Sequence, residues 1–184
     1  MPTGPVKQLE FSFPEEKQSG GRTLVLTRPL SRHRFRDGVV RKVRYAAAFF
    51  PELKGKTIRI GLTRTAKGLA VAGGTEIWFN PARLSYHTIS HELTHLLQGE
   101  TGLPTGEKSC DLFSLARHWT LNDSVPDYIR IPKTLLGENE RIPETSAKLI
   151  FAVASEAVQS RSLGLRNYIA WFEKELASRV RTGR

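Results

Sequence analysis

Cysteine is almost absent from this sequence of 184 residues, and it contains no long hydrophobic run. Cys110 is the only cysteine, so the chain cannot form an internal disulfide and is not one of the disulfide-stabilised secreted scaffolds. No stretch approaches the ~18 consecutive apolar residues of a membrane span, and the first residues carry prolines and charges in place of a hydrophobic signal core. We therefore expect a cytoplasmic protein without a membrane span.

Acidic residues are scarce in the first half of the chain. Residues 1–89 contain 16 basic and 6 acidic side chains, whereas residues 90–184 contain 12 of each. From Arg28 to Arg44 the basic residues surround a single acid, Asp37. Such a cluster can neutralise phosphates, but Phe35 is the only aromatic there that could stack on bases. Nucleic-acid binding is therefore an alternative that the sequence does not favour.

The composition, with 39% hydrophobic and 25% charged residues, is that of a globular protein large enough to bury a core. Prolines and glycines predict an irregular N-terminal arm over residues 1–22. Alternating or β-rich runs predict strands at 23–27, 56–63, 69–72 and 75–79. A 3.6-residue apolar period predicts helices at 37–50, 81–98, 105–119, 144–160 and 165–180. The predicted fold class is α+β, with a core over 23–122 and, packed on it, an irregular segment and C-terminal helices over 123–184.

One motif points to specific chemistry. His91, Glu92 and His95 form an HExxH sequence inside a predicted helix. Residues four apart stack on one helix face, so both imidazoles can bind one zinc ion. The apolar residues of the helix fall on another face, so one face is core and the other lines a cleft. Glu92 would take a proton from a zinc-activated water and pass it to the leaving amine. The alternative is a solvated helix surface that carries two histidines.

A catalytic zinc ion needs a third protein ligand. Glu107, near the start of the next predicted helix, is the residue we expect in this role. Asp111, one turn later, would accept a hydrogen bond from a ligand imidazole and fix its orientation. Asp111 itself and Cys110 are the alternative ligands, and acidic residues in a first turn can also simply suit the helix dipole. We expect His33 and His87 to be structural or solvated.

HExxH on one helix, followed after a short loop by ExxxD (Glu107 to Asp111) on the next, resembles the gluzincin zinc metallopeptidases and, in size, the soluble minigluzincins. The second motif is also similar to the ExxAD signature of the membrane-embedded CAAX-type proteases. The resemblance covers residues 75–119, about a quarter of the chain. It implies a zincin-like fold with a small, twisted, mostly antiparallel sheet, an edge strand over the cleft, an active-site helix, a ligand helix and further C-terminal helices.

The resemblance also implies how a substrate would bind. In this family the strand before the zinc helix pairs with an extended peptide, and here that strand comprises Thr75, Glu76, Ile77, Trp78 and Phe79. The alternative is an interior strand, which would have no free edge. The histidine or tyrosine that often steadies the oxyanion in larger gluzincins has no assigned counterpart. Tyr128, in the irregular segment after the second helix, is the residue we consider for that role.

The favoured function is that of a zinc-dependent metalloendopeptidase with one Zn²⁺ ion and with Glu92 as general acid and base. Two alternatives stay open. The same protease could act on DNA-bound proteins through its basic cluster, or the fold could hold metal as a non-catalytic sensor or regulatory module. A peptide deformylase also uses HExxH, but its cysteine ligand would precede the motif, whereas Cys110 follows it.

Overall fold

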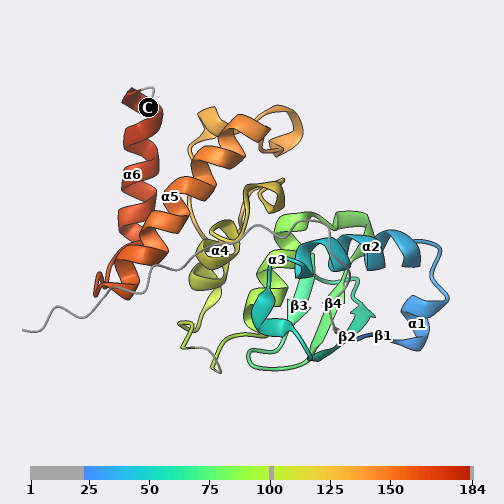
Figure 1. Cartoon of the computed structure of the whole chain (residues 1–184). Helices are drawn as coiled ribbons and strands as arrows, with labels where there is room; N and C mark the ends of the chain where they lie inside the picture. Colours follow the sequence, from blue (N-terminus) through green and yellow to red (C-terminus); the bar gives the residue numbers. More distant parts are fainter. Residues whose placement is uncertain (1–22, 100–101, 183–184) are drawn as a thin grey trace, which may run out of the picture.

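The computed structural model describes residues 23–99 and 102–182. Its elements are β1 (Thr23–Leu26), α1 (Arg28–Ser31), α2 (Arg36–Ala47), β2 (Thr57–Leu62), β3 (Gly68–Ala70), β4 (Glu76–Phe79), α3 (Tyr86–His95), α4 (Glu107–Leu115), α5 (Glu144–Ser162) and α6 (Tyr168–Thr182) (Figure 1). The α+β class is confirmed, and the predicted arm over 1–22 lies outside the described residues. None of the described helices combines the length and apolar character that crossing a membrane requires.

The strands of the described chain form one mixed sheet in the order β1-β2-β4-β3. β1 pairs in parallel with β2, and β2 in parallel with β4, whereas β3 pairs antiparallel with β4. The prediction of a mostly antiparallel sheet is therefore wrong. Parallel neighbours need a crossover connection, and the segment containing α1 and α2 supplies one between β1 and β2. Apolar alternation predicts a strand but carries no information about its direction.

The predicted substrate strand, residues 75–79, is not at an edge. β4 lies between β2 and β3 and pairs with both. Ile77 and Phe79 are fully buried, and this apolar content favours a place in the middle of the sheet. β3 is only three residues long and forms the edge instead. The assignment of an extended peptide to strand 75–79 is thus corrected, because its backbone groups are already paired on both sides.

Helices cover one face of this sheet. Ile60, Ile77 and Phe79 project from that face and share the first hydrophobic cluster with residues of α2 and α3. On the opposite face Arg59 forms an ion pair with Glu76 at 3.1 Å, and the apolar side chains of Val25 and Leu69 are exposed. Only one face of the sheet is therefore covered by helices. Burial of apolar surface between that face and α3, worth about 25 cal/mol per Å², holds the helix in place.

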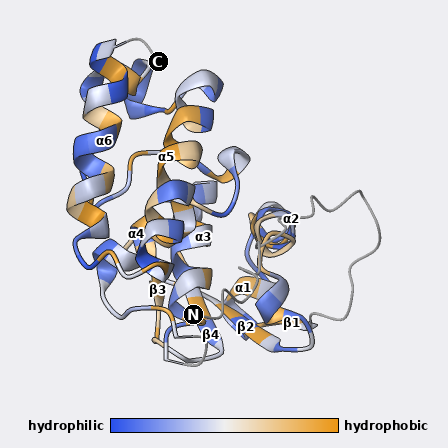
Figure 2. Cartoon of the chain, turned by 60° about the vertical axis from the view of Figure 1, so that its left-hand side comes forward, coloured by the Kyte–Doolittle hydropathy of each residue, from blue (hydrophilic) through white to orange (hydrophobic). Residues whose placement is uncertain are grey.

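A second hydrophobic cluster joins α4 to α5, α6 and residues 129–142. Figures 1 and 2 show α5 and α6 away from the sheet, with α3 and α4 between them and the strands. The sequence predicts α4 as part of a core over 23–122, yet Leu112 and Leu115 of α4 pack in the second cluster. The HExxH motif thus lies on a helix of the first cluster, and the ExxxD motif lies on a helix of the second. The two helices, α3 and α4, are in contact where these clusters meet.

Local features set where these two helices begin. The Ser85 hydroxyl accepts a hydrogen bond from the Thr88 backbone N–H at 3.0 Å, which makes Ser85 the N-cap of α3. Gly106 precedes α4 with a φ of +97°, a left-handed conformation that glycine adopts readily and a helix cannot include. α3 and α4 therefore start later than the apolar period predicts.

Candidate metal centre

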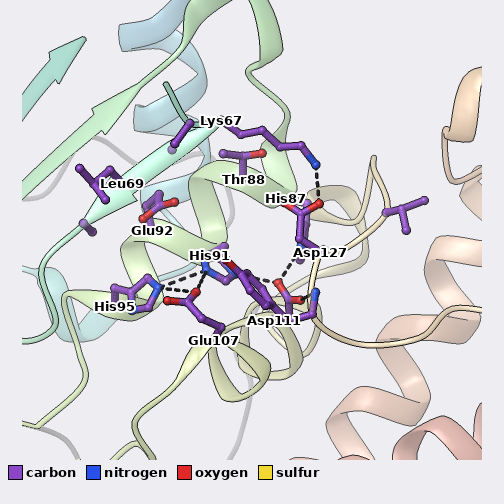
Figure 3. A pocket seen from close by; sticks show the side chains of 15 residues that line it. Lys67, Leu69, His87, Thr88, His91, Glu92, His95, Glu107, Asp111 and Asp127 are labelled. Carbon is purple, nitrogen blue, oxygen red and sulfur yellow. Dashed lines mark hydrogen bonds and ion pairs between the residues drawn. The ribbon is translucent and has the colours of Figure 1, made fainter. Parts of the chain in front are cut away.

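The predicted metal ligands lie where α3 faces α4 (Figure 3). His91 and His95, one turn apart on α3, direct their Nε2 atoms toward each other at a distance of 3.1 Å. From the first turn of α4, Glu107 Oε2 lies 3.0 Å from the Nε2 atom of His91 and 3.2 Å from that of His95. Both histidines are 8% exposed, whereas the Glu107 side chain is 47% exposed, so the site is open to solvent on the side of Glu107. The structure brings the three side chains together at one point.

The size of this arrangement suits a single metal ion. Around a tetrahedral zinc ion with bonds of ~2.0–2.1 Å, neighbouring ligand atoms are ~3.3 Å apart. The three distances of 3.0, 3.1 and 3.2 Å describe a nearly equilateral triangle of about that size. Three protein ligands also leave a coordination position for water or substrate, which is typical of catalytic sites.

Hydrogen bonds on the far side of each ring determine which imidazole nitrogen carries the proton. His91 Nδ1 lies 2.7 Å from Asp111 Oδ1, and His95 Nδ1 lies 2.9 Å from Gln98 Oε1. The Gln98 amide nitrogen donates to two loop carbonyls, so its oxygen faces His95. With Nδ1 as the donor in both rings, both Nε2 lone pairs would point toward the Glu107 carboxylate. Three electron pairs that converge in this way fit a cation.

Asp111 holds His91 through a hydrogen-bond network. Its carboxylate accepts from His91 Nδ1, from His87 Nε2 at 3.2 Å and from the Tyr128 backbone N–H at 2.7 Å. Burial opposes ionisation of this carboxyl, but the hydrogen bonds from His87 and His91 outweigh burial and keep the pKa of Asp111 below its usual range. Burial likewise lowers the pKa of His91, and Asp111 more than reverses that effect. An ionised carboxylate behind a ligand histidine orients the ring and strengthens its binding to metal.

Glu92 lies beside the candidate ligand atoms and is 6% exposed. Burial raises the pKa of its carboxyl group to about 7, and the nearby Glu107 and Asp111 carboxylates add to the rise while His91 opposes it. A group whose pKa lies near neutrality can both take up and release a proton at physiological pH. The structure therefore gives the predicted acid and base an environment that suits proton transfer.

A cavity of about 360 Å³ opens over these residues. One wall is β3 with the two residues before it, and the other is formed by Val125, Asp127 and Tyr128. An ion pair between Lys67 and Asp127 joins the two walls (Figure 3). The Tyr128 ring stacks on the His91 ring, with 5.9 Å between centroids and 22° between planes. Tyr128 thus reaches the cavity. The strand beside the cavity is β3, and not the strand over residues 75–79 that the sequence predicts there.

Sequence reasoning misses two residues of this site. His87, expected to be structural or solvated, is not solvated: it is buried against Asp111 and also lines the cavity, a place at the site that was not predicted. His87 precedes His91 by four residues, so the spacing that relates His91 to His95 could have indicated it. Gln98 follows the last turn of α3, and its contact with His95 depends on how the chain bends there. No spacing rule identifies a residue of that kind.

Two other groups of side chains could hold a metal ion: His91 with His95 and Cys110, and His87 with His91 and Asp111. In the second group, the 2.7 Å between His91 Nδ1 and Asp111 is a hydrogen-bond length, shorter than the ~3.3 Å expected between two ligands of one ion. This short distance favours Asp111 as a partner of His91 over Asp111 as a ligand.

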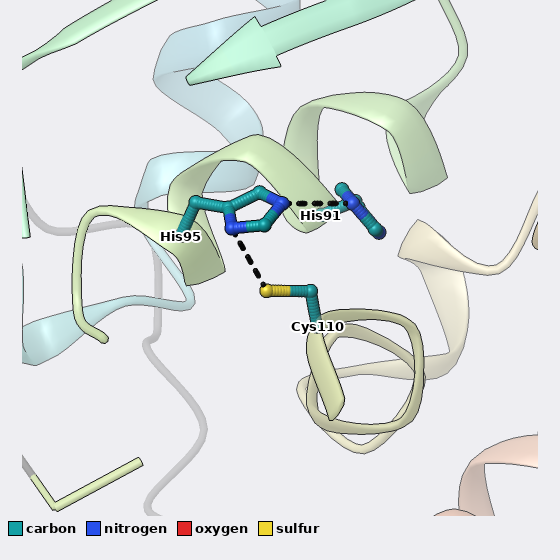
Figure 4. Close-up of side chains that lie close together, drawn as sticks. All are labelled: His91, His95 and Cys110. Atoms are coloured by element: carbon teal, nitrogen blue, oxygen red, sulfur yellow. Dashed lines mark hydrogen bonds between the residues drawn. The ribbon is translucent and has the colours of Figure 1, made fainter. Parts of the chain in front are cut away.

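Cys110 lies behind His95 relative to the cavity. Its Sγ atom is 3.3 Å from His95 Nδ1 (Figure 4). The same nitrogen also lies 2.9 Å from Gln98 Oε1. Cys110 is fully buried and does not line the cavity. Burial, assisted by the Glu107 carboxylate, raises the pKa of its thiol, so without a metal ion the sulfur is protonated. The geometry therefore favours Glu107 over Cys110 as the third ligand.

The basic residues between 28 and 44 lie in another part of the fold. They belong to α1, α2 and the intervening loop, and α1 packs on β2. The cavity lies beside β3, at the opposite edge of the sheet from β1. Arg32, Arg34 and Arg41 are exposed, and Arg36 pairs with Asp37. Nucleic-acid binding by this cluster stays an alternative.

Comparison with known proteins places the chain in no family. No family model matches it, and neither a curated protein nor a solved structure matches it. The resemblance to gluzincins therefore rests on the two motifs and on how their side chains meet.

Proposed function

We propose that this protein is a zinc-dependent metalloendopeptidase. The observation that carries the proposal is the convergence of two imidazole nitrogens and the Glu107 carboxylate beside the buried Glu92, on the floor of an open cavity. Two histidines and one glutamate are a common ligand set of catalytic zinc. Imidazole ligands favour zinc over magnesium and calcium, which prefer oxygen atoms. A purely structural zinc site would instead have four protein ligands.

The residues of the site can divide the reaction between them. When bound, a zinc ion would polarise the peptide carbonyl and lower the pKa of water. Glu92 removes a proton from the attacking water, whose oxygen forms a bond to the carbonyl carbon. The same carboxyl group gives this proton to the amide nitrogen as the C–N bond breaks, which releases an amine and a carboxylic acid. Asp111 keeps the His91 ring oriented throughout.

Tyr128 would stabilise the negative charge that develops on the carbonyl oxygen. Its ring lines the cavity next to His91, and burial together with the charge of Glu107 raises its pKa, so the hydroxyl keeps its proton. Tyr128→Phe should lower kcat by roughly 10²-fold, as loss of one oxyanion donor does, with little change in KM or zinc content. Steady-state kinetics on a quenched-fluorescent peptide measures this.

The control for Tyr128 is Tyr45→Phe, which removes the hydroxyl of an exposed tyrosine on α2 that does not line the cavity. We expect its kcat to match that of the wild type. A Tyr128→Phe variant as active as this control would exclude Tyr128 from the mechanism.

Zinc stoichiometry and zinc-dependent hydrolysis together test the proposed function. We expect the full-length chain to bind one Zn²⁺ ion and to cleave denatured casein or members of a mixed peptide library. A chelator should abolish this activity, and added zinc should restore it. Tight zinc binding without turnover of any peptide would favour the sensor alternative. A chain that binds no zinc would contradict both interpretations.

A further inference from the structure

Glu92 projects from α3 toward the edge strand β3 (Figure 3). A Cβ atom built on Gly68 of β3 would lie 2.5 Å from Glu92 Oε1, 2.7 Å from Cγ and 2.9 Å from Cδ. Cβ atoms essentially never come within 3.0 Å of such neighbours. We infer that the absence of a side chain at Gly68 positions the carboxyl group of Glu92, which makes Gly68 a positioning residue of this site.

Packing, and not hydrogen bonding, holds this carboxyl group. Within residues 23–99 and 102–182, no side chain or backbone group donates a hydrogen bond to Glu92. Asp111, by contrast, accepts hydrogen bonds from three donors. The location of the Glu92 carboxyl group therefore depends on the surfaces it touches, and the backbone at Gly68 is one of them.

Backbone conformation does not explain a glycine at this position. Gly73, in the turn between β3 and β4, has a φ of +68°, which other residues rarely adopt, whereas Gly68 is not among the glycines with positive φ. Gly68 pairs with Phe79 in regular antiparallel register. Other residues can adopt such a strand conformation, so the requirement for glycine here is one of space.

Several contacts hold β3 in place. Pairing with β4 holds it along its length, and at its far end the Gly73 N–H donates to the His95 carbonyl of α3 at 3.0 Å. At its near end, Lys67 is paired with Asp127 across the cavity. With β3 tied on these sides, a methyl group at position 68 should displace the Glu92 carboxyl group and leave the strand in place.

If the protein has the proposed peptidase function, this displacement should slow catalysis. A misplacement of about 1 Å in a catalytic group can cost ~10²-fold in rate. We expect Gly68→Ala to lower kcat by about that factor, with KM changed far less and zinc still bound. Gly38→Ala, in α2, adds the same methyl group where no atom lies within 4 Å and should retain wild-type kinetics.

A second measurement needs neither metal nor activity. In the metal-free full-length protein, Gly68→Ala should lower the Tm by about 2–10 °C because of overpacking, whereas Gly38→Ala should not lower it. In a Glu92→Ala background, the same Gly68→Ala change should lower the Tm much less, because the group it collides with is gone. If Gly68→Ala alone does not fold, recovery of folding in the double variant supports the same conclusion.

The outcomes separate the two proposals. Equal losses of Tm from Gly68→Ala in the two backgrounds, or wild-type kcat in Gly68→Ala, would overturn the inference about Gly68. The wild-type protein could prove inactive while Gly68→Ala still lowers the Tm less in the Glu92→Ala background. That result would contradict the peptidase function and support the steric relation between Gly68 and Glu92.

Discussion

Glu92→Gln should reduce turnover by roughly 10²–10⁴-fold, the usual contribution of general acid and base catalysis, while zinc binding is retained. An amide has nearly the same shape as the carboxyl group, so the packing against β3 and the positions of the metal ligands are preserved. The amide of Gln cannot accept a proton from water or give one to the leaving amine. The measurement combines kcat on a quenched-fluorescent peptide with the zinc content of the purified variant.

A surface glutamate gives the matched control for this change. Glu138 is exposed, lies in a short turn before α5 and does not line the cavity, so Glu138→Gln should keep full activity. Near-normal turnover in Glu92→Gln would refute the role of Glu92 as proton carrier. Loss of zinc in that variant would instead make Glu92 a ligand and change the assignment of the whole site.

Glu107→Ala should have the second large effect, on zinc affinity. Loss of a partner that only supports a ligand histidine typically costs ~10–100-fold in metal affinity, and loss of a direct ligand should exceed this. Glu107 supplies the one ligand atom from α4, so His91 and His95 alone would hold the ion in its absence. Competition with a chromogenic chelator gives the dissociation constant, and metal analysis gives the stoichiometry.

Parallel variants distinguish the three groups of side chains that could hold the ion. If Glu107 is the third ligand, Cys110→Ala should bind zinc as the wild type does. If Cys110 is the third ligand, Cys110→Ala should bind zinc more weakly than Glu107→Ala does. If the ion lies between His87, His91 and Asp111, then Glu107→Ala leaves affinity nearly unchanged and His87→Ala lowers it sharply. Each result excludes the other two arrangements.

An ion bound at the candidate site would have a structural role as well. α3 packs on the sheet in the first hydrophobic cluster, and α4 packs with α5 and α6 in the second. Ligands from both helices would place the ion at the junction of the two clusters. A ligand that binds only the folded state stabilises it, by ~4 kcal/mol at a concentration one thousand times its dissociation constant. Removal of the metal should therefore affect the contact between the two clusters first.

Helical spacing allowed much of the site to be predicted. His91 and His95 are related by one turn within a single helix, and Glu107 and Asp111 by one turn within the next. Relations of this kind follow from the helix period alone, so they hold wherever the helix packs. The predicted start of each helix was less accurate. Ser85 and Gly106 set these starts through local backbone geometry, which the apolar period does not reveal.

The sheet shows the limit of this reasoning. The strands themselves could be predicted, but their order and direction could not, because pairing joins segments that are distant in the sequence. β4 follows β3 after a short turn, and both read as strands of one hairpin. Only the pairing of β4 with β2 shows that β4 is interior and that β3, with Gly68 in it, lies at the edge beside the cavity.

The sequence by itself determined the two helices of the candidate metal centre, the side chains they carry that could act as ligands and the α+β class, since these follow from periodicity and residue chemistry within short segments. The tertiary structure decided which strand borders the cavity, that Gln98 fixes the His95 proton, and that Glu92 lies against Gly68. These are contacts between separate segments, and no local pattern specifies them because they depend on how the whole chain packs.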